Sequence, residues 1–197
     1  MAALPGYLEW VPFAAGMWLL LRAVLALADK TARFWPPERR TGRAYGQFIW
    51  PFRVLFWGLL GLSALSVSRA EPDVATAGFW IGAILFVAGF GTAVLATLQL
   101  GWTTAFGENG PLRRDGWFRF SRNPIYVATW SGQIGWALVF PAPPILAALA
   151  VWAGFYVVAI FLEERDLLRS HRAEFETYKA RTARFLGISH LIEQTEC

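Results

Sequence analysis

The sequence predicts an all-α integral membrane protein with five transmembrane helices, the last two forming a helical hairpin, and a cytoplasmic, amphipathic helical tail at the C-terminus. Three observations support this fold class: the apolar composition, the lengths of the apolar runs and the positions of the basic residues. Of the 197 residues, 56% are hydrophobic and 16% are charged, which is too apolar for an ordinary soluble domain. Because lipid offers no partners to open sheet edges, we expect every span to be a helix.

Five apolar runs follow one another along the chain, and each is a candidate span. An α-helix rises about 1.5 Å per residue, so some 20 residues cross a hydrocarbon core about 30 Å thick. The first three runs reach that length, whereas the last two lie at the lower limit of about 17 residues. The runs cover residues 7–28, 47–68, 78–100, 125–141 and 145–162.

The positions of the basic residues predict the orientation. Most of the 18 Lys and Arg residues lie in segments 29–46 and 101–124 and in the tail that follows residue 163, and five crossings place all three on one side. By the positive-inside rule this side is cytoplasmic and the N-terminus is outside. We therefore expect a protein of the bacterial inner membrane or an equivalent membrane. The net charge of +4 predicts no nucleic-acid partner, because the basic residues flank the spans.

Small residues recur at helical spacing in the third span. Gly78 and Gly82 form a GxxxG pattern, and Gly89 and Gly91 follow in the same run. Because glycine allows two helix backbones to approach closely, the pattern predicts helix packing within the membrane.

The hairpin gathers polar side chains at one point. Pro141-Ala142-Pro143-Pro144 cannot continue a helix, since proline lacks an amide proton and clashes with the preceding turn. An antiparallel hairpin then brings the segment from Arg122 to Tyr126 within helix-packing distance of Glu163 and Glu164, about 8–10 Å. Carboxylates suit an ammonium group or a ribose diol and arginine suits a carboxylate, so the cluster fits S-adenosylmethionine. A purely structural arginine–glutamate pair would produce much of the same pattern.

Three stretches of the chain carry motifs of a known superfamily. Leu112 is followed by residues 115–126 (DGWFRFSRNPIY), then by 163–168 (EERDLL) and 174–181 (EFETYKAR). With these motifs the chain resembles the isoprenylcysteine carboxyl methyltransferase and phospholipid N-methyltransferase superfamily of integral membrane methyltransferases, over roughly residues 100–186. The prenylcysteine enzymes carry histidine where this chain has Asn123, a difference that bears on the acceptor more than on methyl transfer.

The resemblance implies a methyltransferase that uses S-adenosyl-L-methionine, bound between the hairpin and the tail on the cytoplasmic side. It implies catalytic roles for Arg122, Glu163 and Glu164. The acceptor is expected to be lipid-like or prenylcysteine-like, methylated on O, N or S, and membrane lipids are the expected partners. The residues expected to bind the cofactor are Leu112, Gly116, Arg122, Asn123, Pro124, Tyr126, Glu163, Glu164, Tyr178 and Arg181.

Two other function classes fit the same composition. One is a membrane reductase of the steroid-reductase type that uses NADPH, and the other is a membrane scaffold without enzymatic activity. In each case residues 1–100 form three N-terminal helices, and residues 101–197 form the loop, hairpin and tail of one integrated domain.

No metal site is expected, because His171 and His190 lack a suitably spaced ligand partner.

Several features have two interpretations. Adjacent residues on a helix point about 100° apart, so one of Glu163 and Glu164 faces the ligand and the other a structural partner such as an arginine. Arg22 and Arg53 either snorkel to the headgroups or line a polar pocket or grip an anionic headgroup. The charged tail, residues 163–185, either lies as an amphipathic helix on the leaflet or covers a cofactor.

Overall fold

The computed structural model describes residues 5–29, 34–37, 41–105 and 112–187, and within them the regular structure is entirely helical. The predicted all-α fold class is therefore confirmed. Five long helices form the body of the molecule, and four short elements complete it. The long helices are α1 (Val11–Ala28), α2 (Arg43–Ser68), α3 (Ala77–Leu100), α5 (Pro124–Val139) and α6 (Pro143–Ser170), and the short elements are η1 (Gly6–Trp10), α4 (Trp102–Ala105), η2 (Gly116–Arg119) and α7 (Arg172–Arg181).

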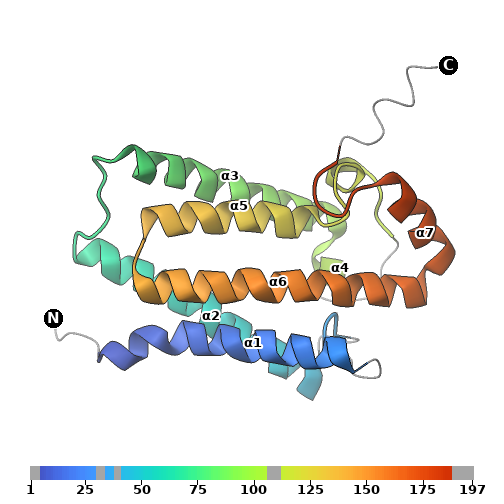
Figure 1. The fold of residues 1–197 in the computed structure, drawn as a ribbon, viewed down its shortest axis with the longest axis horizontal. Coiled ribbons are helices and arrows are strands. Elements are labelled where there is room, and N and C mark those ends of the chain that lie inside the picture. The colour runs from blue at the N-terminus through green and yellow to red at the C-terminus, as the bar shows by residue number, and fades with distance from the viewer. Residues whose placement is uncertain (1–4, 30–33, 38–40, 106–111, 188–197) are drawn as a thin grey trace.

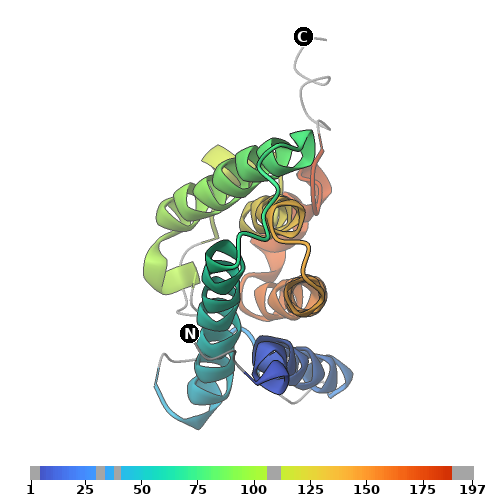
Figure 2. The same ribbon diagram turned by 90° about the vertical axis from the view of Figure 1, so that its left-hand side faces the viewer.

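The long helices run alternately up and down, so that the α1–α2 connection, the α3–α5 connection and α7 lie at one end of the bundle (Figure 1). Seen end-on, α5 lies between α3 and α6, and α1 packs on the other side of α6 (Figure 2). Within the described chain, four helices are long and apolar enough to cross a membrane. They are Gly6–Ala28, Tyr45–Ser68, Ala77–Leu100 and Pro143–Ser170.

The remaining long helix, α5, has 16 residues and is therefore about 24 Å long. It is shorter than the four candidate spans, although it runs antiparallel to both of its neighbours (Figure 1). Four of the five predicted spans thus correspond to helices that are long and apolar enough to cross a membrane, and the span at α5 remains a prediction.

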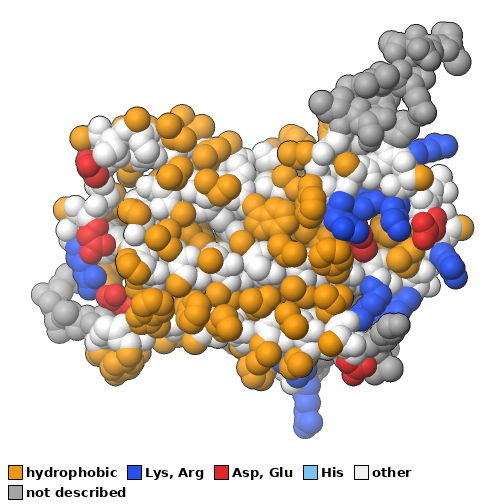
Figure 3. All heavy atoms as spheres, viewed as in Figure 1, with side chains coloured by type: hydrophobic (Ala, Val, Ile, Leu, Met, Phe, Trp, Pro, Cys, Tyr) orange, Lys and Arg blue, Asp and Glu red, His pale blue; other side chains and the backbone are white. Residues whose placement is uncertain are grey.

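The surface of the bundle is apolar along its sides and charged at its ends. Orange side chains spread over the middle of the face drawn in Figure 3, and on this face the Lys and Arg side chains gather mainly at the end that carries α7. Several large hydrophobic side chains are exposed on the helices: Trp57 is 64% exposed, Ile84 67% and Val87 70%. Exposed apolar surface on this scale is unfavourable in water. It is suited to a hydrocarbon environment, as expected for an integral membrane protein.

Glycines bring α3 and α5 into backbone contact. A Cβ atom at Gly89 would lie 2.2 Å from the backbone N of Gly132, and one at Gly135 would lie 2.5 Å from the backbone O of Gly82. The predicted packing role is therefore confirmed for Gly82 and Gly89. It is wrong for Gly78, whose Cβ position has only Thr76 Oγ1 within 4.0 Å, and for Gly91, which has open space around it. The two α5 glycines were not predicted from the sequence.

The fifth predicted span is longer than the apolar run that suggested it. α6 continues past residue 162 to Ser170, so the two adjacent glutamates lie on a helix that is still packed against its neighbours. Its last turns consist largely of good helix formers, and the buried Glu164 is tolerated there because it has charged partners within the protein. The chain turns at His171, and only α7 forms a separate helix in the tail.

Candidate functional site

A cavity of about 380 Å³ opens at the end of the bundle that carries α7. Its inner part is an aromatic slot between α2, α3 and α6, and its outer part is polar and lies between α5, α6 and α7. The slot is lined by Phe48, Phe52, Phe56, Phe90, Trp152 and Phe155, and the polar part by Arg122, Asn123, Tyr126, Glu163, Glu164, Asp166 and Tyr178. One continuous space thus joins a charged chamber to an apolar one.

Glu163 is held by two neutral donors. The Tyr126 hydroxyl donates a hydrogen bond to its carboxylate, and the indole Nε1 of Trp35 donates another at 2.6 Å. Trp35 is itself fixed by the Phe48 ring, whose centre lies 4.4 Å from its own. The Tyr156 ring packs edge-on against Tyr126, with 4.6 Å between the centres. The carboxylate therefore sits among aromatic rings with no cation paired to it among the described residues.

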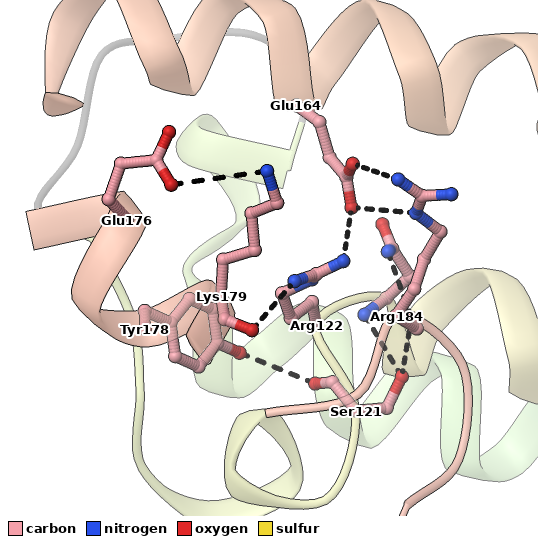
Figure 4. Close-up of polar contacts among 8 residues, drawn as sticks. Ser121, Arg122, Glu164, Glu176, Tyr178, Lys179 and Arg184 are labelled. Atoms are coloured by element: carbon pink, nitrogen blue, oxygen red, sulfur yellow. Dashed lines mark hydrogen bonds and ion pairs between the residues drawn. The ribbon is translucent and has the colours of Figure 1, made fainter. Parts of the chain in front are cut away.

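Glu164 has the opposite environment, because two arginines surround it (Figure 4). Arg122 Nη2 lies 3.0 Å from one carboxylate oxygen, and Arg184 donates through Nε at 3.1 Å and through Nη2 at 2.8 Å. The hydrogen bond from Arg184 to Glu164 raises the pKa of the guanidinium above its ordinary value. Glu164 is 8% exposed, and a charge buried to this extent requires such partners.

The tail is fastened across the loop that precedes α5. The backbone N of Arg122 donates to Ala183 O at 2.9 Å, and its Nη1 donates to Lys179 O at 3.2 Å. Asn123 Nδ2 donates to the backbone O of Arg184 at 3.0 Å. These contacts close the polar part of the cavity, hereafter the polar chamber, from one side.

A buried tyrosine completes this attachment. The hydroxyl of Tyr178 donates to Phe118 O at 2.6 Å (the bond to Ser121 O, at 3.4 Å, is drawn in Figure 4). Burial raises the pKa of Tyr178 well above its ordinary value. The hydroxyl is therefore protonated near neutral pH and available as a donor.

The structure brings most of the predicted site residues to one cavity. Those that line it are Leu112, Arg122, Asn123, Pro124, Tyr126, Glu163, Glu164 and Tyr178. Gly116 and Arg181 lie outside it: Arg181 is exposed, and Gly116 has a φ of 57°. A Cβ atom at Gly116 would lie 1.7 Å from Gln99 Nε2. Gly116 therefore shapes the loop against α3, which is a structural role.

The role of Trp35 as a hydrogen-bond donor to Glu163 was not predicted from the sequence. This residue lies between α1 and α2, far along the chain from the glutamates, yet it donates to Glu163. Its only signal in the sequence is a tryptophan at the edge of a basic segment, which is also typical of an interfacial anchor. Arg22 and Arg53 do not line the cavity, so the interpretation that places them in this polar pocket is wrong.

Residues 77–173 match the family model described as phospholipid methyltransferase. This segment belongs to the phospholipid methyltransferase family. The family is part of the isoprenylcysteine carboxyl methyltransferase-like superfamily of membrane methyltransferases, so the resemblance stated from the motifs is confirmed.

The matched segment contains α3, α5 and α6 and therefore the α5 and α6 sides of the polar part of the cavity, whereas nearly all of α7 lies outside it. Trp35 and the attached tail lie outside it. Among the curated proteins compared with this chain, none matches it. The match of this segment to the phospholipid methyltransferase family indicates a membrane methyltransferase.

Proposed function

We propose that this protein transfers a methyl group from S-adenosylmethionine to a lipid-like acceptor at the cytoplasmic face of the membrane. The observation that carries the proposal is the continuous cavity, which joins the charged chamber at the end of α6 to the aromatic slot inside the bundle. A charged donor and an apolar acceptor require two such compartments in contact. The positive-inside rule favours a cytoplasmic location for the chamber, since the basic segments lie at its end of the bundle.

The chamber offers the groups that this cofactor requires. Arg122 lines it and has a buried Nε that has no hydrogen-bond partner among the described residues, which leaves a donor for a carboxylate. Glu163 and Asp166 lie on its wall and suit an ammonium group or a ribose diol. When bound, the cofactor supplies an electrophilic methyl group on a sulfonium.

The protein has two tasks in such a displacement: to align the acceptor and to exclude water. The tail across Arg122 and the rings of Trp35, Phe155 and Tyr156 serve the second task. If the acceptor is an amine or a thiol, a base must take its proton, whereas a carboxylate acceptor needs none. We assign the base to Glu163, because Glu164 is occupied by two arginines.

Calorimetry on the purified, folded protein tests the proposal directly. We expect heat of binding with S-adenosylhomocysteine and none with NADPH, and a labelled methyl group from S-adenosylmethionine should appear in a lipid extract. Binding of NADPH alone would favour the reductase, and binding of neither compound at millimolar concentration would favour a scaffold without enzymatic activity.

A further inference from the structure

Arg22 lies in the apolar stretch of α1, about six residues and therefore roughly 9 Å before the helix ends at Ala28. Its surroundings are aromatic and neutral. The guanidinium carbon lies 5.9 Å from the centre of the Trp18 ring and 5.8 Å from that of Phe34. Arg22 Nη2 donates to the side-chain oxygen of Gln47 at 3.0 Å. These contacts fix the position of the guanidinium, and none of them supplies a counter-charge from the residues that the structure describes.

Among the described residues, the hydrogen-bonding capacity of Arg22 is largely unused. A guanidinium carries five N–H donors, and the contact with Gln47 accounts for one of them. Its Nε is buried without a hydrogen-bond partner, and no carboxylate pairs with Arg22 in the part of the chain that the structure describes. A charged side chain inside a span is expensive unless it finds a counter-charge. Arg22 thus has the environment of an anion-binding group whose anion comes from outside the protein.

The position of Arg22 indicates the source of that anion. On the same helix, Trp18 is 45% exposed and Leu21 and Leu25 are each 52% exposed, so an acyl chain can lie along them. Gln47 lies near the first residue of α2, so the guanidinium is drawn towards the basic end of the bundle. Trp18 Nε1 donates to Gln47 O at 3.3 Å and ties the two helices together at this level.

We propose that Arg22, with Gln47 and Trp18, binds the phosphate of a membrane glycerophospholipid. The site is separate from the cavity, because none of these three residues lines it. It is nevertheless close to the cavity along the chain: Phe34 packs against Arg22, and the next residue, Trp35, donates to Glu163. A bound lipid would therefore stabilise the segment that supplies a wall of the methyl-transfer chamber.

Simple snorkelling is the competing explanation, and the chain contains a matched control for it. Arg53 lies in the next span, is exposed, and has its guanidinium 5.1 Å from the centre of the Trp50 ring. Within the described part of the chain, Arg53 has neither the second ring nor the amide contact that Arg22 has. Snorkelling alone predicts that both arginines contribute equally to lipid binding.

The test is native mass spectrometry or calorimetry on the delipidated, full-length protein in detergent. The probes are dioctanoyl phosphatidylglycerol, dioctanoylglycerol as the same lipid without phosphate, and inorganic phosphate. We expect only the phospholipid to bind, at a defined stoichiometry. Arg22→Gln should weaken its binding at least about ten-fold, because a charged hydrogen-bond donor is lost. Arg53→Gln should stay within about two-fold of wild type, as expected for an exposed rim charge.

Three outcomes would overturn the site: wild-type affinity in Arg22→Gln, equal losses in the two glutamine variants, or equal binding of inorganic phosphate. If Arg22→Gln does not fold, Arg22→Lys decides, since lysine keeps the charge but loses the planar fork. A loss of at least about three-fold in Arg22→Lys supports the site, and unchanged affinity contradicts it. The measurement needs no methyl donor, so it can fail or succeed independently of the proposed activity.

Discussion

At the scale of single residues, the two adjacent glutamates have different partners. Glu163 accepts hydrogen bonds from Tyr126 and Trp35, which are neutral, whereas Glu164 is paired with Arg122 and Arg184. The sequence leaves open which glutamate faces the ligand. The environment of Glu163 favours that role, because Glu164 already holds the tail to the loop before α5.

The two glutamine substitutions should therefore have different effects. Glu163→Gln should slow methyl transfer by about 2–4 kcal/mol in barrier height if the carboxylate stabilises charge in the transition state, with little change in thermal stability. Glu164→Gln should lower the free energy of unfolding by about 1–3 kcal/mol, because Arg122 is left without its counter-charge. Single-turnover kinetics and thermal unfolding separate the effects. Wild-type activity and cofactor affinity in both variants would show that the site is misplaced.

Trp35 provides a second prediction at this scale. Trp35→Phe keeps an aromatic ring and removes the donor to Glu163, so we expect methyl transfer to fall about ten-fold through misplacement of the carboxylate. Protein stability should change by about 1 kcal/mol or less, the net contribution of one hydrogen bond. Trp57→Phe, at an indole that is 64% exposed, is the control and should keep full activity. Equal activity of the two variants would refute a role for Trp35.

At the scale of helices, the contact between α3 and α5 sets the position of the site. Gly89 and Gly132 allow the two backbones to touch, and α5 carries Tyr126 and the loop before it carries Arg122. The Trp136 indole of α5 donates to Ser63 Oγ at 2.7 Å and fixes α5 against α2 as well. A change in this packing should therefore reach the cavity even though it occurs within the membrane.

Two alanine substitutions in α3 test this packing. A Cβ atom at Gly89 would meet Gly132 backbone, so Gly89→Ala should destabilise the protein by about 1–3 kcal/mol through overpacking. Gly91→Ala is the matched control, because nothing lies within 4 Å of its Cβ position. We expect its melting temperature to be unchanged or slightly higher, since alanine favours a helix over glycine. Equal melting temperatures in detergent would contradict the close contact.

At the scale of the whole molecule, charge and hydropathy are arranged along one axis. Apolar side chains cover the sides of the bundle, and basic side chains gather beside α7 (Figure 3). Under the proposed function, such an arrangement favours a cavity mouth at a membrane surface, where the donor and the lipid-like acceptor would meet. The positive-inside rule favours the cytoplasmic side for this end of the bundle, and this orientation remains a prediction.

Cysteine labelling tests the five crossings and the orientation together. With Cys197 replaced by serine, Pro141→Cys between α5 and α6 should react with an impermeant maleimide from outside. Arg114→Cys, before α5, should react only after the membrane is permeabilised, because α5 separates the two positions. Labelling of both positions from the same side would show that α5 does not cross. Reversed accessibility would place the chamber outside.

The sequence by itself determined the all-α class, four of the helices, the turn between α5 and α6 and the family motifs. These features are local: hydropathy over some 20 residues, proline punctuation and contiguous motifs are each read without knowledge of distant contacts. The approach of Tyr126 to Glu163 was also predictable, because a short turn joins their helices. The length of α6 was not, since buried partners rather than local hydropathy keep its last turns packed.

Only the tertiary structure decided what depends on segments far apart in sequence. Trp35, which lies between α1 and α2, reaches Glu163, and Arg184, which follows α7, reaches Glu164, because the fold brings these segments to the end of α6. The same holds for Gly132, whose role depends on Gly89 facing it. In lipid, the hydrophobic effect does not favour one apolar helix neighbour over another. Close packing and a few interhelical hydrogen bonds therefore determine the arrangement. That selection assigns different surroundings to Glu163 and Glu164, although the two residues are adjacent in the chain.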